Sequence, residues 1–132
     1  MRSALLVDTD VMVDFLRGHV LATTLLMDNS ERIILSSIVA AELYAGVKGD
    51  VELATLDKLL SVFRVIPVSS EIAREGGILK RDYFKSHGIG LADAIVAATA
   101  LSENADLKTL NIKHYPMFKG LCPAYTKTRD TT

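Results

Sequence analysis

The chain has 132 residues, of which 49% are apolar and 23% are charged, and its formal net charge is −1. This length and composition fit one compact domain with a full hydrophobic core. The near-neutral charge excludes a protein that coats nucleic acid by bulk electrostatics, but it is compatible with a local basic groove. A single cysteine, Cys122, excludes an internal disulfide and a thiolate zinc site. We therefore expect a cytoplasmic protein, without a stretch long enough to span a membrane.

Short apolar runs alternate with longer amphipathic segments along the chain. The apolar runs predict strands at 4–7, 33–35, 62–68, 107–110 and 121–124. The segments between them predict helices that start at a capping residue or a glycine turn, over residues 9–18, 20–28, 36–46, 50–60, 69–85 and 91–103. Gly76 and Gly77 fall inside one of these helices, where they mark a weak point or a close-packing site.

This alternation predicts βαβ units, in which helices cover both faces of a mainly parallel sheet. We therefore predict an α/β fold with three layers, α/β/α, around a central sheet of about five strands. Residues 1–126 are expected to form a single domain, and residues 127–132 a polar C-terminal tail. Ligands in such sheets bind at the carboxyl ends of the strands, where the strand order reverses.

Three carboxylates stand in apolar surroundings. Asp8 directly follows the strand 4–7, Glu42 has uncharged neighbours three and four positions away on its helix, and Asp93 opens a helix that is apolar all round. A buried carboxylate without a partner is costly, and no cationic residue adjoins these three in the sequence. The pattern indicates that they hold a cation. The alternatives are a surface position for Glu42 and a favourable interaction of Asp93 with the dipole of its helix.

Three further residues are weaker candidates for the same site. Asp10 is either the N-cap of the first helix or a residue that supports the ligands, and Asp14 is expected to face solvent. Asn111 follows the strand 107–110. Its amide oxygen is an acceptable ligand for a hard cation, but asparagine is also an ordinary turn former.

All of these candidate ligands are oxygen donors, which favours Mg²⁺ or Mn²⁺ over zinc. The histidines show no metal-ligand spacing: His19, His87 and His114. The sequence has no serine or cysteine framed by a base and no glycine-rich phosphate loop, so covalent catalysis and the use of nucleoside triphosphates are disfavoured. The remaining chemistry is attack of a metal-activated water on a phosphodiester.

These residues also resemble a known family. From about residue 4 to residue 125 the chain is similar to the PIN-domain ribonucleases, and most closely to the toxin components of VapBC toxin–antitoxin pairs. The resemblance rests on an ordered set of motifs, namely Leu6-Val7-Asp8-Thr9-Asp10, Phe15-Leu16-Arg17-Gly18, Ser36-Ser37, Glu42-Leu43-Tyr44-Ala45-Gly46, the run from Gly90 to Thr99 around Asp93, and the run from Thr109 to Tyr115 around Asn111.

The resemblance implies a Mg²⁺- or Mn²⁺-dependent endoribonuclease whose acidic pocket is formed by Asp8, Glu42 and Asp93. Asn111 would stand at a fourth position that varies between acid and amide in the family. The resemblance also implies a homodimer, and an antitoxin protein whose tail enters the pocket. Asp10 departs from the family pattern, which more often has asparagine there.

Two other functions stay open at this point. Val7-Asp8-Thr9-Asp10-Val11 fits the opening motif of haloacid-dehalogenase-type phosphatases, although that fold also needs a distal lysine and a later pair of aspartates, and Asp93 stands alone. The second alternative is a catalytically inactive PIN-like domain that binds a partner.

Basic residues and unburied apolar helix residues also indicate where the chain could contact RNA and a second copy of itself. Four basic residues are candidates for contacts with RNA phosphates: Arg17, Lys48, Arg81 and Lys113. The apolar helix segments exceed what one small sheet can bury. We therefore expect a surface shared by two copies of the chain that draws on Val47, Leu53, Leu56, Leu59 and Leu60.

Overall fold

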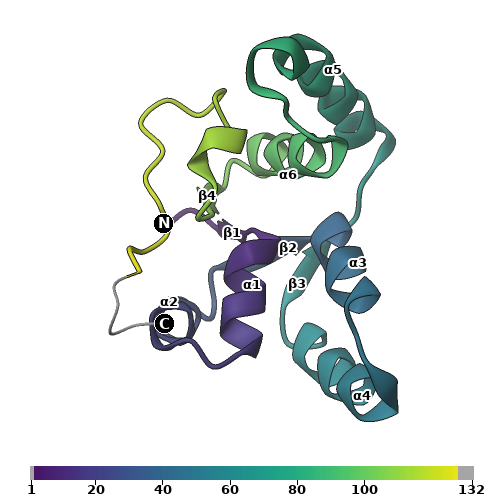
Figure 1. Ribbon diagram of the computed structural model, residues 1–132, viewed down its shortest axis with the longest axis vertical. Coiled ribbons are helices and arrows are strands. Elements are labelled where there is room, and N and C mark those ends of the chain that lie inside the picture. Colours follow the sequence, from purple (N-terminus) through teal and green to yellow (C-terminus); the bar gives the residue numbers. More distant parts are fainter. Residues whose placement is uncertain (1, 128–132) are drawn as a thin grey trace.

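The structure is a computed structural model that describes residues 2–127 (Figure 1). In this part of the chain the elements follow one another as β1 (Leu5–Val7), α1 (Thr9–Leu16), α2 (Val20–Asp28), β2 (Ile33–Ser36), α3 (Ser37–Ala45), α4 (Gly49–Leu60), β3 (Arg64–Ile66), α5 (Ser70–His87), α6 (Leu91–Ser102), β4 (Asp106–Lys108) and the short 3₁₀ helix η1 (Ile112–His114). Apart from Lys127, the predicted polar tail lies outside the described residues.

The helices begin and end at residues whose chemistry explains the boundary. Asp8, Ser36 and Ser69 each accept a hydrogen bond from a backbone N–H in the first turn of the helix that follows. Gly88 ends α5 with φ +62°, a left-handed conformation that favours glycine. The helix predicted at 20–28 has those bounds in the structure. Among residues 2–127, no helix combines the length and apolarity needed to cross a membrane.

The four strands run parallel in the order β3-β2-β1-β4. The chain moves outward from β1 through β2 to β3, and then returns to form β4 on the other side of β1. The strand order therefore reverses between β1 and β4, and their carboxyl ends border the crevice where ligands bind in open α/β sheets. Asp8 directly follows β1 and Thr109 directly follows β4.

The α/β class and the parallel sheet are confirmed, but the described residues contain four strands, and the segment 121–124 is not a fifth. This segment lies beside the end of β4, where the Ala124 N–H donates to the Thr109 carbonyl at 2.8 Å. Pro123 has no N–H with which to extend that contact into a ladder. Pro67 likewise follows the last residue of β3, which is shorter than predicted.

Helices cover both faces of the sheet, as predicted. Figure 1 shows α5 and α6 together on one side of the strands, and α1, α2 and α4 on the other. The reversal of strand order explains this division. Right-handed crossovers made in opposite directions along a sheet place their helices on opposite faces.

The core lies on both faces of the sheet, between the central strands β1 and β2 and the helices that cover them. Every residue of β1 and β2 is buried, and α6 contributes mainly small side chains. α5 approaches α6 closely at Gly76, where an added Cβ would lie 3.0 Å from Ile95 Cγ1 and 3.2 Å from Ile95 Cα. At Gly77 an added Cβ would meet nothing within 4 Å. Gly76 is therefore a close-packing site, and it helps to fix α6, whose first turn carries Asp93.

The predicted dimer surface is wrong in part. Leu56 and Leu60 are buried within this chain, because they form the inward face of α4. Side chains that are already buried cannot be shared with a second copy. Leu53 is 41% exposed and is still available for such a contact.

Candidate active site

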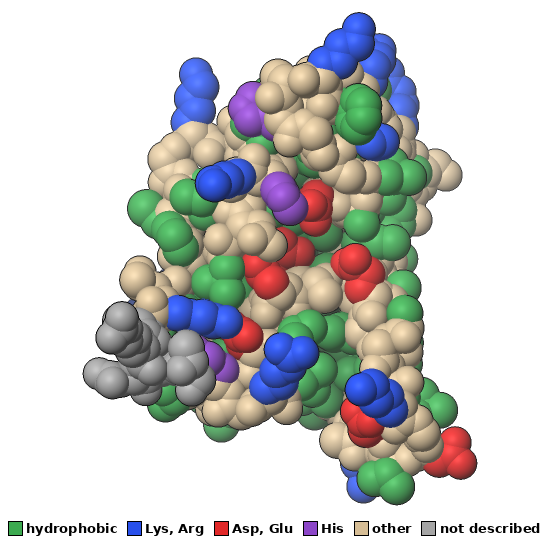
Figure 2. Space-filling model, in the orientation of Figure 1, with side chains coloured by type: hydrophobic (Ala, Val, Ile, Leu, Met, Phe, Trp, Pro, Cys, Tyr) green, Lys and Arg blue, Asp and Glu red, His purple; other side chains and the backbone are tan. Residues whose placement is uncertain are grey.

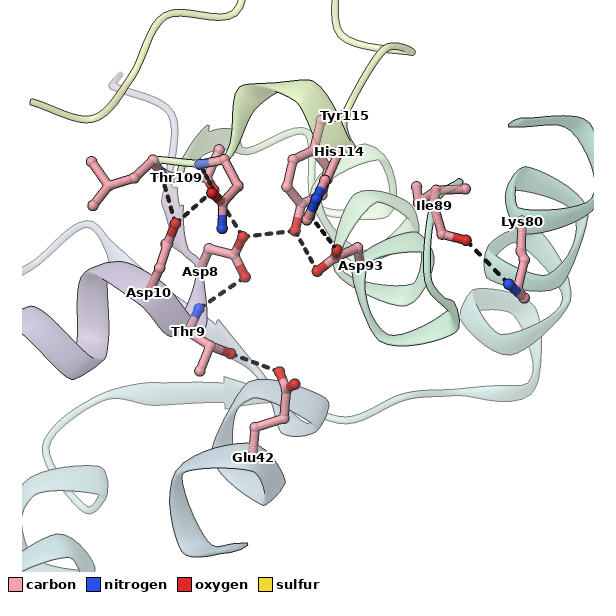
Figure 3. Close-up of polar contacts among 12 residues, drawn as sticks. Asp8, Thr9, Asp10, Glu42, Lys80, Ile89, Asp93, Thr109, His114 and Tyr115 are labelled. Atoms are coloured by element: carbon pink, nitrogen blue, oxygen red, sulfur yellow. Dashed lines mark hydrogen bonds and ion pairs between the residues drawn. The ribbon is translucent and has the colours of Figure 1, made fainter. Parts of the chain in front are cut away.

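Asp8 lies where β1 passes into α1, and 5% of the residue is exposed. Its Oδ1 accepts a hydrogen bond from the Thr9 N–H at 2.8 Å and so caps α1. Its Oδ2 accepts hydrogen bonds from the hydroxyls of Thr109 at 2.9 Å and Tyr115 at 2.7 Å (Figure 3). Both carboxylate oxygens are therefore held by neutral donors.

Burial raises the pKa of Asp8, because the charged form loses hydration. The hydrogen bonds from Tyr115, Thr9 and Thr109 lower the pKa in part, and the negative charge of Asp93 raises it further. Within residues 2–127, no lysine or arginine forms an ion pair with Asp8, Asp93 or Glu42. Asp8 is thus a desolvated acid without a cationic partner in the described part of the chain.

Asp93 reaches the same place from the first turn of α6. Its Oδ1 lies 3.3 Å from the Tyr115 hydroxyl, and its Oδ2 lies 2.9 Å from His114 Nδ1 (Figure 3). The Tyr115 hydroxyl has one proton, which it can direct to either carboxylate, and the shorter contact makes the hydrogen bond to Asp8 the stronger of the two. Burial raises the pKa of Tyr115, and the charges of Asp8 and Asp93 raise it further, so this hydroxyl remains protonated between the two carboxylates.

Glu42 joins the cluster from α3 through a second hydroxyl. The Thr9 Oγ1 donates a hydrogen bond to Glu42 Oε1 at 2.7 Å. The prediction that Glu42 is buried is wrong, because the residue is exposed. α3 buries the narrow face that carries Val39 and Leu43, so the apolar neighbours of Glu42 in the sequence do not enclose it. Glu42 therefore stands at the rim of the site.

Asp10 is not the N-cap of α1, which is Asp8, and it instead holds the loop that follows β4. Its Oδ2 accepts a hydrogen bond from the Leu110 N–H at 2.9 Å and lies 3.4 Å from Thr109 Oγ1. Burial raises the pKa of Asp10, and the charge of Asp8 raises it further. Asn111 comes next in this loop, where its backbone N–H donates to Thr109 Oγ1 at 3.1 Å and the residue is exposed. Asp10 therefore ties the start of α1 to the loop that carries Asn111.

Asp14 does not face solvent, contrary to the prediction. The residue is 8% exposed, and its Oδ2 accepts a hydrogen bond from the Tyr125 hydroxyl at 2.6 Å and contacts Lys127 Nζ at 2.8 Å. Burial opposes ionisation, but the hydrogen bonds from Lys127 and Tyr125, together with the charge of Lys127, outweigh it and lower the pKa of Asp14. The C-terminal segment folds back against α1, which local helical periodicity does not reveal.

Two of the four basic residues that were candidates for RNA contacts line a groove beside Glu42. This groove between α1, α3 and α4 has a volume of about 510 Å³, and Arg17 and Lys48 are part of its lining. Arg81 instead pairs with a neighbouring aspartate on the exposed side of α5, and Lys113 is exposed in η1. Figure 2 shows acidic side chains near the centre of this face, with basic side chains above and below them.

The donor chemistry of the cluster fits a hard divalent cation. Asp8, Asp93 and Glu42 offer carboxylate oxygens and Asn111 offers an amide oxygen, which are the ligand types that Mg²⁺ and Mn²⁺ prefer. The charges of Asp8 and Asp93 oppose each other, and a cation between them would relieve that repulsion. In residues 2–127, no three acidic, histidine or cysteine side chains close around a common point. The ligand set is therefore open as it stands.

The sequence pattern alone did not predict the polar groups that connect the acids. Thr9, Thr109 and Tyr115 supply the connecting hydroxyls, and His114, which was expected to be a surface or turn residue, contacts Asp93. Thr9 adjoins Asp8 and Thr109 directly follows β4, whereas His114 and Tyr115 lie three and four positions after Asn111. Position relative to the strand ends was therefore the one available signal.

Comparisons with known proteins agree with this geometry. Residues 5–115 match the PIN domain family model. The chain is 45% identical over 124 residues to Ribonuclease VapC19 of Mycobacterium tuberculosis, with coverage of 91% of this chain and 98% of that protein. It is 40% identical over 124 residues to Ribonuclease VapC10 of the same organism, with 92% of each covered.

Solved structures of similar fold include a toxin–antitoxin complex and a VapBC pair. A toxin–antitoxin complex from Klebsiella pneumoniae matches with a TM-score of 0.79 and 28% identity, covering 93% of this chain and 98% of that chain. VapBC2 from Rickettsia felis, solved with a DNA fragment from its promoter, matches with a TM-score of 0.72 and 29% identity, covering 89% and 95%. The family match spans Asp8, Glu42, Asp93 and Asn111. The chain belongs to the PIN-domain family.

Proposed function

We propose that this chain is a divalent-metal-dependent endoribonuclease of the VapC type, which acts in the cytoplasm as the toxin of a toxin–antitoxin pair. The observation that carries the proposal is the sharing of one tyrosine hydroxyl by Asp8 and Asp93 at the reversal of strand order. Relatives named VapC ribonucleases, at 45% and 40% identity, support RNA as the substrate. Neighbours solved as toxin–antitoxin complexes support an antitoxin protein as the partner.

In this proposal Asp8, Glu42 and Asp93 hold the cation, Mg²⁺ or Mn²⁺, and Asn111 is the candidate fourth ligand. When bound, the cation supplies the charge that activates water and stabilises the leaving oxygen of a phosphodiester. Burial keeps bulk water away from Asp8, and the surrounding hydroxyls fix its orientation. Glu42 is exposed at the rim, and its carboxylate can accept a proton from the attacking water.

The groove beside Glu42 is the path that we propose for the RNA strand. Arg17 and Lys48 line it, and cationic side chains there would neutralise backbone phosphates. The groove leads to the acidic cluster, because Glu42 belongs to both. We therefore assign phosphate contacts to Arg17 and Lys48 before Arg81 and Lys113. A homodimer remains part of the proposal, with Leu53 as an exposed contact.

A haloacid-dehalogenase-type phosphatase is overturned by the PIN-domain family match, which spans residues 5–115. The two remaining functions, a nuclease and an inactive partner-binding domain, differ in one measurable property. A nuclease turns over RNA in the presence of the cation, and a binding module does not.

The test is cleavage of total bacterial RNA by the purified protein in Mn²⁺, in Mg²⁺ and in EDTA, with Asp8→Asn alongside. We expect cleavage products with either cation, and their loss in EDTA and in the variant. Cleavage that persists in EDTA, or that equals wild type in Asp8→Asn, would contradict the proposed chemistry. A folded wild-type protein that cleaves nothing with either cation would point to the inactive binding module.

A further inference from the structure

We propose that Tyr115 is a positioning residue for the cation site, whose hydroxyl sets the spacing and orientation of Asp8 and Asp93. This inference rests on the proposed function, because it concerns the cation that those carboxylates would hold. The hydroxyl lies 2.7 Å from Asp8 Oδ2 and 3.3 Å from Asp93 Oδ1, and so it contacts one oxygen of each carboxylate.

Tyr115 is fixed well enough to act in this way. The residue is 1% exposed, and its ring packs beside that of Phe118 with centroids 6.3 Å apart. Its backbone N–H donates to the Ile112 carbonyl at 3.1 Å, which anchors it to η1. Asp8 follows β1 and Asp93 lies on α6. Tyr115, which follows η1, therefore links the end of β1 to the first turn of α6. The link holds the Asp8 carboxylate at a set distance from the Asp93 carboxylate.

The hydroxyl is suited to hold two anions that repel each other. A tyrosine hydroxyl is neutral at pH 7, so it can donate a hydrogen bond but cannot replace a carboxylate as an anionic ligand. Without it, Asp8 Oδ2 would keep the Thr109 hydroxyl, and Asp93 would keep His114 on its other oxygen. No described contact would then link the two carboxylates. Groups that hold metal ligands in this way typically contribute 10–100-fold to metal affinity.

The chain offers a matched control for this substitution. Tyr125 also donates its hydroxyl to a buried aspartate, Asp14, at 2.6 Å. Tyr115→Phe and Tyr125→Phe therefore remove the same atom and the same kind of hydrogen bond. Asp14 has Lys127 as its cationic partner and is not one of the proposed ligands.

The experiment is calorimetric titration of the metal-free protein with Mn²⁺ for wild type, Tyr115→Phe and Tyr125→Phe. We expect the Kd of Tyr115→Phe to rise by about 10–100-fold. We expect Tyr125→Phe to bind like wild type. The Mn²⁺ concentration for half-maximal RNA cleavage should rise in parallel for Tyr115→Phe, a shift that general loss of stability does not produce in a protein that remains folded by circular dichroism.

Binding by Tyr115→Phe with the affinity of wild type would overturn the inference. Tighter binding would also overturn it, because it would mean that the hydroxyl competes with the cation for the carboxylates. If wild type binds no Mn²⁺, the proposed function fails first, and so the two failures are distinguishable.

A measurement on wild type covers the case in which Tyr115→Phe does not fold. The buried hydroxyl proton of Tyr115, observed by nuclear magnetic resonance, is expected to shift when diamagnetic Mg²⁺ is added. A resonance that stays unchanged at saturating Mg²⁺ would contradict the positioning role.

Discussion

Two buried aspartates near one helix behave in opposite ways. Asp8 caps α1 and Asp14 lies inside it, and each accepts a hydrogen bond from a tyrosine hydroxyl, Tyr115 and Tyr125 respectively. Burial and Asp93 raise the pKa of Asp8, against the effect of its hydrogen bonds. For Asp14, burial also opposes ionisation, but Lys127 and the tyrosine outweigh it and the pKa is lowered.

The difference shows what separates a structural acid from a candidate ligand. Asp14 is satisfied by a cation that the chain itself provides, so this aspartate ties the C-terminal segment to α1. Asp8 faces a second carboxylate, and in the described residues no cationic side chain pairs with it. An external cation would supply the missing partner.

The largest expected effect is the loss of RNA cleavage on neutralising one ligand. We expect Asp8→Asn, Asp93→Asn and Glu42→Gln each to lower the rate by two to three orders of magnitude or more, the scale on which preorganised charge contributes to catalysis. Asp14→Asn should retain cleavage, although losing a charged hydrogen-bond acceptor should lower the free energy of unfolding by about 1.5–3 kcal/mol. A gel assay with chemical denaturation of each variant checks both. Near wild-type cleavage by a folded ligand variant would remove that residue from the site.

A second prediction concerns the helix that brings Asp93 to Asp8. Gly76→Ala should lower the free energy of unfolding by about 1–3 kcal/mol, because the added methyl group meets Ile95. Gly77→Ala, one position away, should be neutral or stabilising by up to about 1 kcal/mol, because helix propensity improves and nothing is touched. Urea denaturation measures both. Equal effects would mean that α5 and α6 are not in close contact there.

The pH dependence of stability should separate the two aspartates. Asp8 has a raised pKa, so its ionised form costs folding free energy above the ordinary value of 3.8, and that cost is relieved as the pH falls through the raised value. Asp14 has a lowered pKa, so its contribution is present above 3.8 and is lost as the pH falls below that value.

Unfolding of metal-free protein in EDTA between pH 8 and pH 4 measures this difference. Wild type should gain stability relative to Asp8→Asn as the pH falls across this range. Asp14→Asn should keep the pH profile of wild type there. Parallel profiles for wild type and Asp8→Asn would show that ionised Asp8 carries no cost.

The smallest expected effect comes from removing the internal cation. Lys127→Ala should raise the pKa of Asp14, because the effect of burial would then be opposed by the Tyr125 hydrogen bond and the charge of His19 without the lysine. The loss of stability at pH 7 should be at most about 1 kcal/mol, since the lysine side chain is 40% exposed and screened by solvent. Nuclear magnetic resonance titration of the Asp14 carboxyl checks the direction. A pKa that stays lowered would show that Lys127 is not the cause.

Much of the fold follows from the sequence, because its signals are local. The periodicity of 20–28, the caps at Ser36 and Ser69, and the apolar runs of the first two strands depend on neighbouring residues. The cap of the first helix was predicted less well, because it is Asp8 and not Asp10. The predicted strand at 121–124 failed, because strand formation there depends on pairing with β4 and Pro123 cannot donate to it.

The sequence predicts those site residues that directly follow a strand or open an apolar helix. Asp8 and Asp93 were found by their apolar settings, but the exposure of Glu42 and the burial of Asp14 depend on how distant segments pack. Tyr115 approaches Asp8 across 107 positions of sequence. A contact between residues this far apart in the sequence depends on the tertiary fold. The hydroxyls that hold the acids could therefore not be predicted from local sequence patterns.

The central claim is that Asp8 and Asp93, unlike Asp14, form a place for an external divalent cation. The most direct test is thermal unfolding at pH 7 in EDTA and in millimolar Mn²⁺ for wild type, Asp93→Asn and Asp14→Asn. We predict that Mn²⁺ stabilises wild type and Asp14→Asn, by about 2.7 kcal/mol at one hundred times Kd. Asp93→Asn should lose most of this response. Unfolding curves of wild type that coincide in EDTA and in Mn²⁺ would contradict the claim.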